Sequence, residues 1–174
     1  MSDYNRTNTQ QLTRILEPHV KAAGLYLDDV RLTRAGKHSV LLITVDLEYG
    51  PGGVDSADLE SVTRAISAVL DAEDPIPGAY TLEVSTPGAE RNVSTEREFS
   101  RVIGHLVQFT LNTGEQFLAR VEKVTTNELK VWTVVKSGKR DVPGVHRTIE
   151  MTTISKARSV VELTKVDFES EEDA

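Results

Sequence analysis

The side chains with the greatest capacity for chemistry are four histidines and a scattered set of aspartates, and the chain has no cysteine. His19, His38, His105 and His146 are far apart, and none has a second histidine at the spacing of a zinc motif. Without thiolate ligands a zinc site is not expected. We therefore predict surface or packing roles for the histidines, and we predict no metal and no cofactor.

Three aspartates could in principle form a hydrolytic or Mg²⁺-binding cluster: Asp28, Asp29 and Asp46. Neighbouring strand residues point to opposite faces, so Asp28 and Asp29 converge on one ion only if the strand contains a bulge. An enzyme that uses Asp28, Asp46 or Asp55 is therefore the weakest of the hypotheses considered. We predict that the chain is not an enzyme.

Charge divides the chain into an acidic first half and a basic second half. The net balance is −6 over residues 1–94, +4 over residues 95–165 and −5 over residues 166–174. Basic side chains in the second part could contact phosphate or a partner: Arg97, Arg101, Lys123, Lys130, Lys136, Lys139 and Arg140. Because eight acids are interspersed, an ordinary solvated surface is an equally good interpretation. Trp132 alone does not make a base-stacking platform.

The elements that would position these residues begin with an α-β-β-α-β pattern. Apolar residues at helical spacing predict a helix over residues 8–23, with Thr9 as N-cap and a kink or break at Pro18. Strands are expected at 25–34 and 40–48, the second buried on both faces. A helix over 56–70 capped by Asp55 and a parallel strand over 80–85 complete the first domain.

In the second half the apolar period changes to two, after a short helix that Thr95 and Glu98 would cap. Strands are expected at the following residues: 107–111, 117–121, 128–135, 147–151 and 159–163. A long connection is expected over 136–145, where Gly138, Pro143 and Gly144 occur. Five short strands at this spacing are typical of a small barrel.

The fold class is therefore α+β with two domains: an α-β-β-α-β domain over 1–94 and a small β-barrel over 95–165. Residues 166–174 are expected to be an acidic, disordered tail. The polar N-terminus has no apolar core of a signal peptide, and no apolar run is long enough for a membrane span. A soluble cytoplasmic protein is expected.

The junction between the two halves reads L-E-V-S-T-P-G-A-E-R-N-V at residues 82–93, and Phe99, Arg101 and Gly104 follow it. This stretch resembles the junction of the RimP family of ribosome maturation factors, whose pattern is L-E-V-S-S-P-G-x-D-R-P-L followed by F-x-R-x-x-G. Thr86, Glu90 and Val93 preserve the chemical character of the family residues, whereas Asn92 replaces a proline.

This resemblance implies an SH3-like or Sm-like second domain and a non-catalytic role in maturation of the small (30S) ribosomal subunit. It implies that the chain binds the immature particle and small-subunit ribosomal protein twelve, near the decoding centre, with rRNA phosphate as a further contact. We expect the junction residues to contact a partner or to set the geometry between domains: Glu83, Ser85, Pro87, Gly88 and Arg91. A stand-alone RNA-binding regulator with an Sm-like barrel is the alternative.

Overall fold

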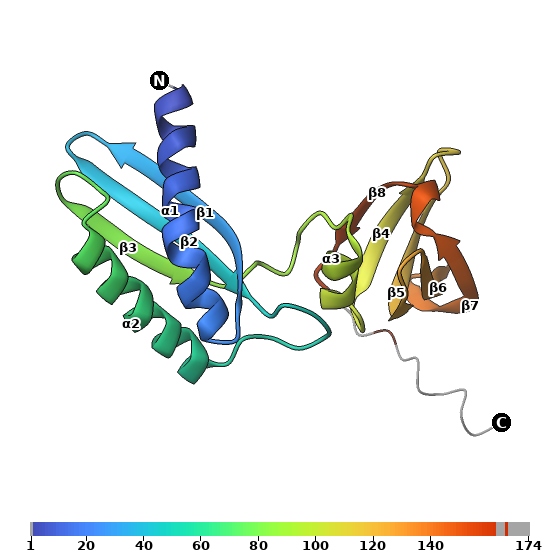
Figure 1. Cartoon of the computed structure of the whole chain (residues 1–174). Coiled ribbons are helices and arrows are strands. Elements are labelled where there is room, and N and C mark those ends of the chain that lie inside the picture. The colour runs from blue at the N-terminus through green and yellow to red at the C-terminus, as the bar shows by residue number, and fades with distance from the viewer. Residues whose placement is uncertain (1, 163–165, 167–174) are drawn as a thin grey trace. The chain divides into compact units, whose positions relative to one another are not determined.

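The computed structural model describes residues 2–162 and 166, which form two compact units (Figure 1). The first unit comprises the chain up to Glu48 together with Gly52–Pro87. The second comprises Tyr49–Pro51 and the chain from Gly88 onward. Within the described residues, no helix is long and apolar enough to cross a membrane.

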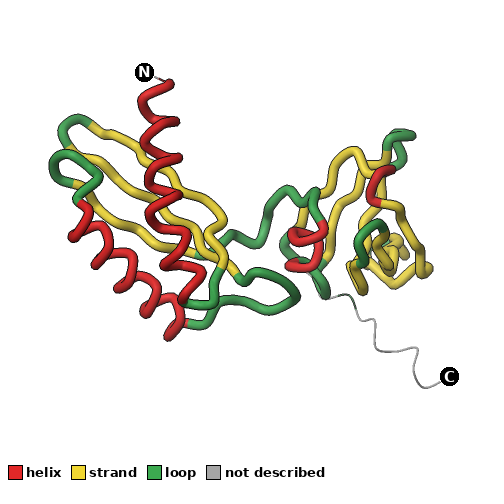
Figure 2. The backbone as a smooth tube through the Cα atoms, in the orientation of Figure 1, coloured by secondary structure: helices red, strands yellow, loops and turns green. Residues whose placement is uncertain are grey.

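The first unit contains two helices and three strands in the predicted α-β-β-α-β order (Figure 2). Their bounds are α1 Ser2–Ala22, β1 Tyr26–Ala35, β2 His38–Asp46, α2 Ser56–Glu73 and β3 Tyr80–Ser85. The sheet order is β1-β2-β3, with β2 antiparallel to β1 and parallel to β3. The predicted parallel third strand and the predicted Asp55 N-cap of α2 are both confirmed.

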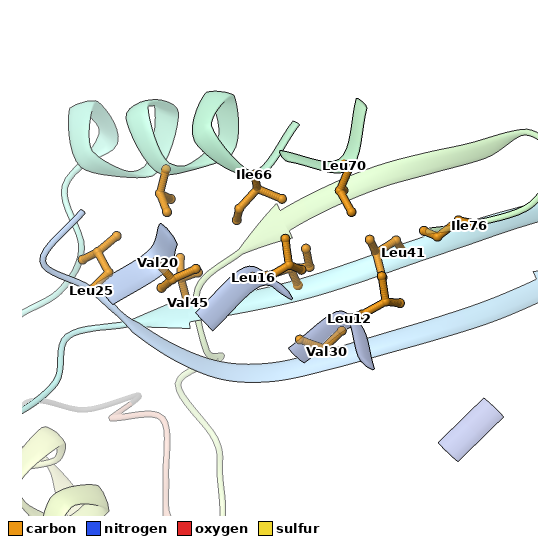
Figure 3. Close-up of a cluster of buried hydrophobic side chains, with 12 residues drawn as sticks. Leu12, Leu16, Val20, Leu25, Val30, Leu41, Val45, Ile66, Leu70 and Ile76 are labelled. Carbon is orange, nitrogen blue, oxygen red and sulfur yellow. The ribbon is translucent and has the colours of Figure 1, made fainter. Parts of the chain in front are cut away.

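Both helices cover one face of this sheet. Apolar stripes of α1 and α2, among them Leu16 and Ile66, pack on Leu41 and Val45 of β2 (Figure 3). Residues of β2 alternate between buried and half-buried, as expected when only one face is covered. The prediction that this strand is buried on both faces is therefore wrong: β2 is central in the sheet, but no helix of the described residues covers its second face.

Helix α1 begins at Ser2, not after a cap at Thr9, and continues through Pro18 without a break. Thr9 lies inside the helix, where its carbonyl accepts a hydrogen bond from the Thr13 hydroxyl at 2.8 Å. Proline removes one helical hydrogen bond. Leu16 and Val20 are fully buried on either side of Pro18, so packing holds both halves of the helix on the sheet.

The second unit contains one short helix and one sheet. The bounds are α3 Glu96–Arg101, β4 Leu106–Leu111, β5 Gln116–Val124, β6 Glu128–Ser137, β7 Arg140–Glu150, a 3₁₀ turn Met151–Thr153, and β8 Ile154–Ser159. The predicted capping box is confirmed, because the Thr95 hydroxyl accepts from the Glu98 N–H at 3.1 Å. The sheet order is β7-β6-β5-β4-β8, with β7 and β8 as its edges, so in the described residues the strands form no closed barrel.

Two strand predictions in this unit are wrong. The expected long connection over 136–145 is mostly strand: β6 and β7 form a long hairpin that turns at Gly138, which has a φ of +63°. Pro143 is tolerated because β7 is an edge strand. The last strand is β8 at Ile154–Ser159, before the predicted 159–163. Residues 163–165, and all of the predicted tail at 166–174 except residue 166, lie outside the described residues.

Candidate interaction surface

The junction motif ends as a short additional strand on β8. Asn92 forms an antiparallel bridge with Arg158, and the N–H of Val93 donates to the Ala157 carbonyl at 3.0 Å. On the other side of the bridge, the Ser159 N–H donates to the Arg91 carbonyl at 2.9 Å. An ion pair of 3.2 Å joins Arg158 to Glu90. Residues 89–93 are thus an ordered part of the second unit.

The side chain of Ser159 binds the backbone of this added strand. It is 2% exposed, and its hydroxyl donates to the Ala89 carbonyl at 2.7 Å and accepts from the Arg91 N–H at 3.0 Å. Ser159 was not predicted from the sequence, because a serine 68 residues from Arg91 carries no local signal of this contact. Only the pairing of the junction with β8 brings the two together.

Replacing Ser159 with alanine is expected to lower the free energy of unfolding of the second unit by about 1–2 kcal/mol, since the backbone groups of Ala89 and Arg91 lose their partner. Urea unfolding followed by circular dichroism measures this. Ser155→Ala is the matched control, because Ser155 is an exposed serine of the same strand. Equal stabilities of the two variants would contradict the role given to Ser159.

The earlier part of the motif lies in the first unit. Glu83 and Ser85 are exposed on β3, opposite Leu42 and Thr44 of β2 in register. These positions belong to the sheet face that no helix covers. Pro87 is half-buried and Gly88 exposed, and the chain passes from one unit to the other between them. The structure therefore separates the candidate residues of the motif into two groups, with Arg91 in the second unit.

The basic candidates are dispersed over the second unit. Lys139 and Arg140 are exposed at the β6–β7 turn, and Lys136 beside them forms an ion pair with Asp141 at 2.6 Å. Arg97 is half-buried on α3. Arg101 is only 5% exposed and donates to the Gly50 carbonyl, so it is an interior residue of this unit and not a surface contact for phosphate.

Lys123 and Lys130 are brought together on the outer face of the sheet. They are direct register partners on β5 and β6, and both are exposed. Trp132 lies two residues further along β6 and therefore points to the same face as Lys130. Its register partner on β7 is His146, and the two rings stack with centroids 4.4 Å apart.

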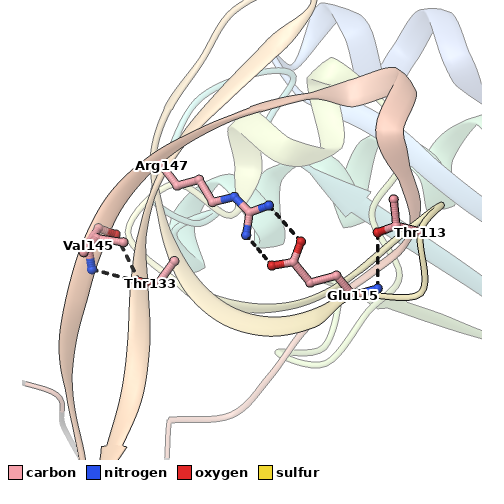
Figure 4. Close-up of polar contacts among 5 residues, drawn as sticks. All are labelled: Thr113, Glu115, Thr133, Val145 and Arg147. Atoms are coloured by element: carbon pink, nitrogen blue, oxygen red, sulfur yellow. Dashed lines mark hydrogen bonds and ion pairs between the residues drawn. The ribbon is translucent and has the colours of Figure 1, made fainter.

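A close contact between β6 and β7 sets the register of this aromatic pair. The Thr133 hydroxyl donates to the Val145 carbonyl at 3.1 Å and accepts from the Val145 N–H at 2.9 Å (Figure 4). Gly144 leaves the space that this contact needs, because a Cβ there would lie 2.5 Å from the Thr133 hydroxyl oxygen. We call Thr133, Gly144 and Val145 the β6–β7 clamp.

A second polar contact joins β7 to the start of β5. Arg147 donates to both carboxylate oxygens of Glu115, at 2.7 and 2.9 Å (Figure 4). Its guanidinium also lies 4.6 Å from the centre of the Phe117 ring. These hydrogen bonds lower the pKa of Glu115 below its ordinary value of 4.5, against the opposing effect of desolvation. They also raise the pKa of Arg147.

This pair is expected to make stability pH-dependent. Because the folded-state pKa of Glu115 is depressed, its contribution is present above pH 4.5 and is lost as the pH falls through the folded-state value. The difference in unfolding free energy between the parent and Glu115→Gln should therefore favour the parent at neutral pH and shrink in acid. Urea titrations at several pH values measure it, and a difference independent of pH would contradict the assignment.

The aspartates of the enzyme hypothesis each have a structural setting. Asp46 is 2% exposed and accepts from the Leu47 N–H at 2.9 Å, while Asp55 caps α2. Asp28 is exposed at a register shift of β1, so the bulge that convergence would need is present. Even so, among residues 2–162 and 166 no three His, Cys, Asp or Glu side chains are grouped to hold a metal ion.

A comparison with protein families identifies the first unit. Residues 15–90 match the family model described as the RimP N-terminal domain. The match begins within α1 and runs past β3 into the junction motif, so it covers the sheet, α2 and most of the residues on which the resemblance was based. Residues 15–90 therefore form a domain of the RimP N-terminal type, as the resemblance of the junction motif led us to expect.

Proposed function

We propose that this protein promotes assembly of the small (30S) ribosomal subunit by binding immature particles in the cytoplasm, as a non-catalytic factor. The RimP N-terminal domain at residues 15–90 is the observation that carries the proposal. The partners are the immature small subunit, small-subunit ribosomal protein twelve near the decoding centre, and the phosphate backbone of rRNA.

The distribution of charge supports a division of these partners between the two parts of the chain. With a balance of −6, residues 1–94 suit a basic ribosomal protein; with +4, residues 95–165 suit rRNA. We propose these two ranges as the functional domains, with 166–174 as an acidic tail. The second is proposed to be an SH3-like or Sm-like barrel, in line with its five consecutive antiparallel strands.

Exposed acids of α2 allow a test of the proposal that residues 1–94 bind a basic ribosomal protein. Asp71 and Glu73 lie in the last turns of that helix and are exposed. The double variant Asp71→Asn/Glu73→Gln should bind isolated ribosomal protein twelve more weakly, with a smaller dependence on salt. Glu128→Gln, an exposed acid of the second unit, is the control. Equal binding by all three proteins would contradict the acidic docking surface.

The role proposed for Arg91 has its own test. Arg91 is half-buried, and the Ser159 hydroxyl accepts a hydrogen bond from its backbone N–H. The backbone from which the Arg91 side chain extends is therefore fixed in place. Capture of immature particles by Arg91→Ala should be weaker than capture by Arg34→Ala, an exposed arginine of β1. If Arg91→Ala captures particles as well as the parent does, the junction motif is only a linker and Arg91 has no role in binding.

Affinity purification of the full chain distinguishes the main proposal from its alternative. Precursor particles and a ribosomal protein are the expected co-purifying species. Recovery of messenger or small RNA without particles would instead establish a stand-alone RNA-binding regulator.

A further inference from the structure

We propose that the outer face of β5, β6 and β7 binds single-stranded RNA by stacking one unpaired base on His146 and contacting the adjoining phosphates with Lys123 and Lys130. We call these residues, together with Trp132, the stacking face. The inference rests on the proposed function, since it names the part of an RNA-containing particle that this surface would contact.

The aromatic part of the stacking face is already arranged as a stack. The Trp132 and His146 rings are 4.4 Å apart with an interplanar angle of 30°. The His146 side chain is 62% exposed. Because one face of the imidazole lies on the indole, this exposure leaves the other face open to solvent. A base placed there would extend a two-ring stack to three, the contact by which proteins bind unpaired bases.

Hydrogen bonds hold both rings in place. The Nδ1 of His146 donates to the Glu122 carboxylate at 3.0 Å, and the indole N–H of Trp132 donates to the Gly144 carbonyl at 3.4 Å. Glu122 is the acid that contacts the rings, and its carboxylate is occupied by the imidazole. The rings therefore need little reordering when a ligand binds, which reduces the entropic cost of binding. Two further exposed acids of this face, Glu128 and Glu150, are register partners at its end, beyond Lys130.

Besides the aromatic stack, the face carries two neighbouring positive charges, those of Lys123 and Lys130. Like charges directly opposite each other on neighbouring strands destabilise a sheet. Neither Lys123 nor Lys130 takes part in any ion pair formed in the described part of the chain. An anion between them would convert this repulsion into attraction. Lys130 and Trp132 are about 7 Å apart along β6, so one nucleotide can reach both positions.

A nucleotide fits this combination better than a protein does. An acidic peptide would neutralise the lysines but has no particular need of two stacked rings. A nucleotide carries a flat aromatic base and a negative phosphate on one flexible unit. Stacking and charge, the two contacts that we infer, do not depend on which base is bound, so the recognition is expected to be tolerant of sequence.

Intrinsic fluorescence tests the stack directly, because Trp132 is the sole tryptophan of the chain. The full-length protein is titrated with a short oligouridylate and with an abasic strand of equal length. The oligouridylate should quench the emission to saturation and bind about ten-fold tighter or more than the abasic strand, as loss of one base–aromatic stack predicts. Equal affinity and equal quenching by the two strands would overturn the proposal.

Variants distinguish the contribution of the His146 ring to RNA binding from that of the two lysine charges. His146→Ala should weaken oligouridylate binding by about ten-fold, whereas His146→Phe, which keeps an aromatic face, should retain most of it. Lys123→Gln/Lys130→Gln should reduce the slope of log K against log salt by about 1.4, the value for two phosphates of a single strand. Lys21→Gln/Lys37→Gln, two exposed lysines of the first unit, is the matched control. A slope unchanged by the first pair would overturn the phosphate contacts.

Particle capture distinguishes failure of this inference from failure of the proposed function. If the parent captures immature particles but neither the oligouridylate nor His146→Ala shows the expected effects, the stacking face is refuted and the proposed function stands. If the oligouridylate binds as predicted but no particle is captured, the proposed function fails and the stacking face remains as an RNA site.

Discussion

Replacing Phe109 with alanine is expected to lower the free energy of unfolding of the second unit by about 3–5 kcal/mol. Phe109 is fully buried between two other rings, with Phe99 of α3 at 6.3 Å and Phe117 of β5 at 5.3 Å between centroids. Deleting the middle ring removes the contacts of all three. The cavity cannot close easily, because its walls are the helix and the strand that carry the outer rings.

Urea unfolding measures this effect, with Trp132 emission as a reporter in the same unit. Phe109→Leu is the conservative control and should lose much less, because leucine fills most of the cavity. Phe117→Ala should also lose less, since Phe117 is half-buried. Equal losses for the Phe109 and Phe117 alanine variants would mean that the stack is not centred on Phe109.

Gly144→Ala should cost about 2–3 kcal/mol, in the upper part of the range for overpacking. The added Cβ would lie 2.5 Å from the Thr133 hydroxyl oxygen and 3.2 Å from the Thr133 carbonyl. Thr133 is β-branched, buried and bonded twice to Val145, so it cannot rotate away without losing those hydrogen bonds. The β6–β7 clamp then opens, and His146 shifts relative to Trp132.

A double-mutant cycle identifies the cause. Thr133→Ala removes the hydroxyl that the new Cβ would strike, so adding Gly144→Ala to it should cost clearly less than Gly144→Ala costs in the parent. Gly53→Ala is the matched control, because a Cβ there has nothing within 4 Å. Trp132 emission should change with Gly144→Ala and not with Gly53→Ala. Additive losses in the cycle would show that the clash is not with Thr133.

Much of the first unit was predictable from short stretches of sequence. The bounds of β3, the start of α2 and its Asp55 cap depend on neighbouring residues, since capping and apolar period are local properties. The junction motif, which is also a contiguous stretch, was sufficient for the family assignment that the match at residues 15–90 then confirmed.

Predictions became wrong where packing overrode a local signal. Pro18 predicted a kink or break, but the buried residues around it keep α1 continuous. Gly138, Pro143 and Gly144 predicted a loop, yet Pro143 and Gly144 lie in an edge strand and only Gly138 occupies the turn. In both places tertiary contacts compensate for a residue that is unfavourable in an isolated element.

The sequence by itself determined the order of elements, the caps of α2 and α3, the family resemblance and the opposite charges of residues 1–94 and 95–165, because each of these is encoded in adjacent residues or in sums over them. Only the tertiary structure decided which side chains meet. Two of these meetings are register pairs on neighbouring strands: Trp132 with His146 and Lys123 with Lys130. The third is the hydrogen-bonded contact of Ser159 with the junction. Their registers depend on irregularities such as the β6–β7 clamp, and a slip of one residue would turn each side chain to the opposite face of the sheet.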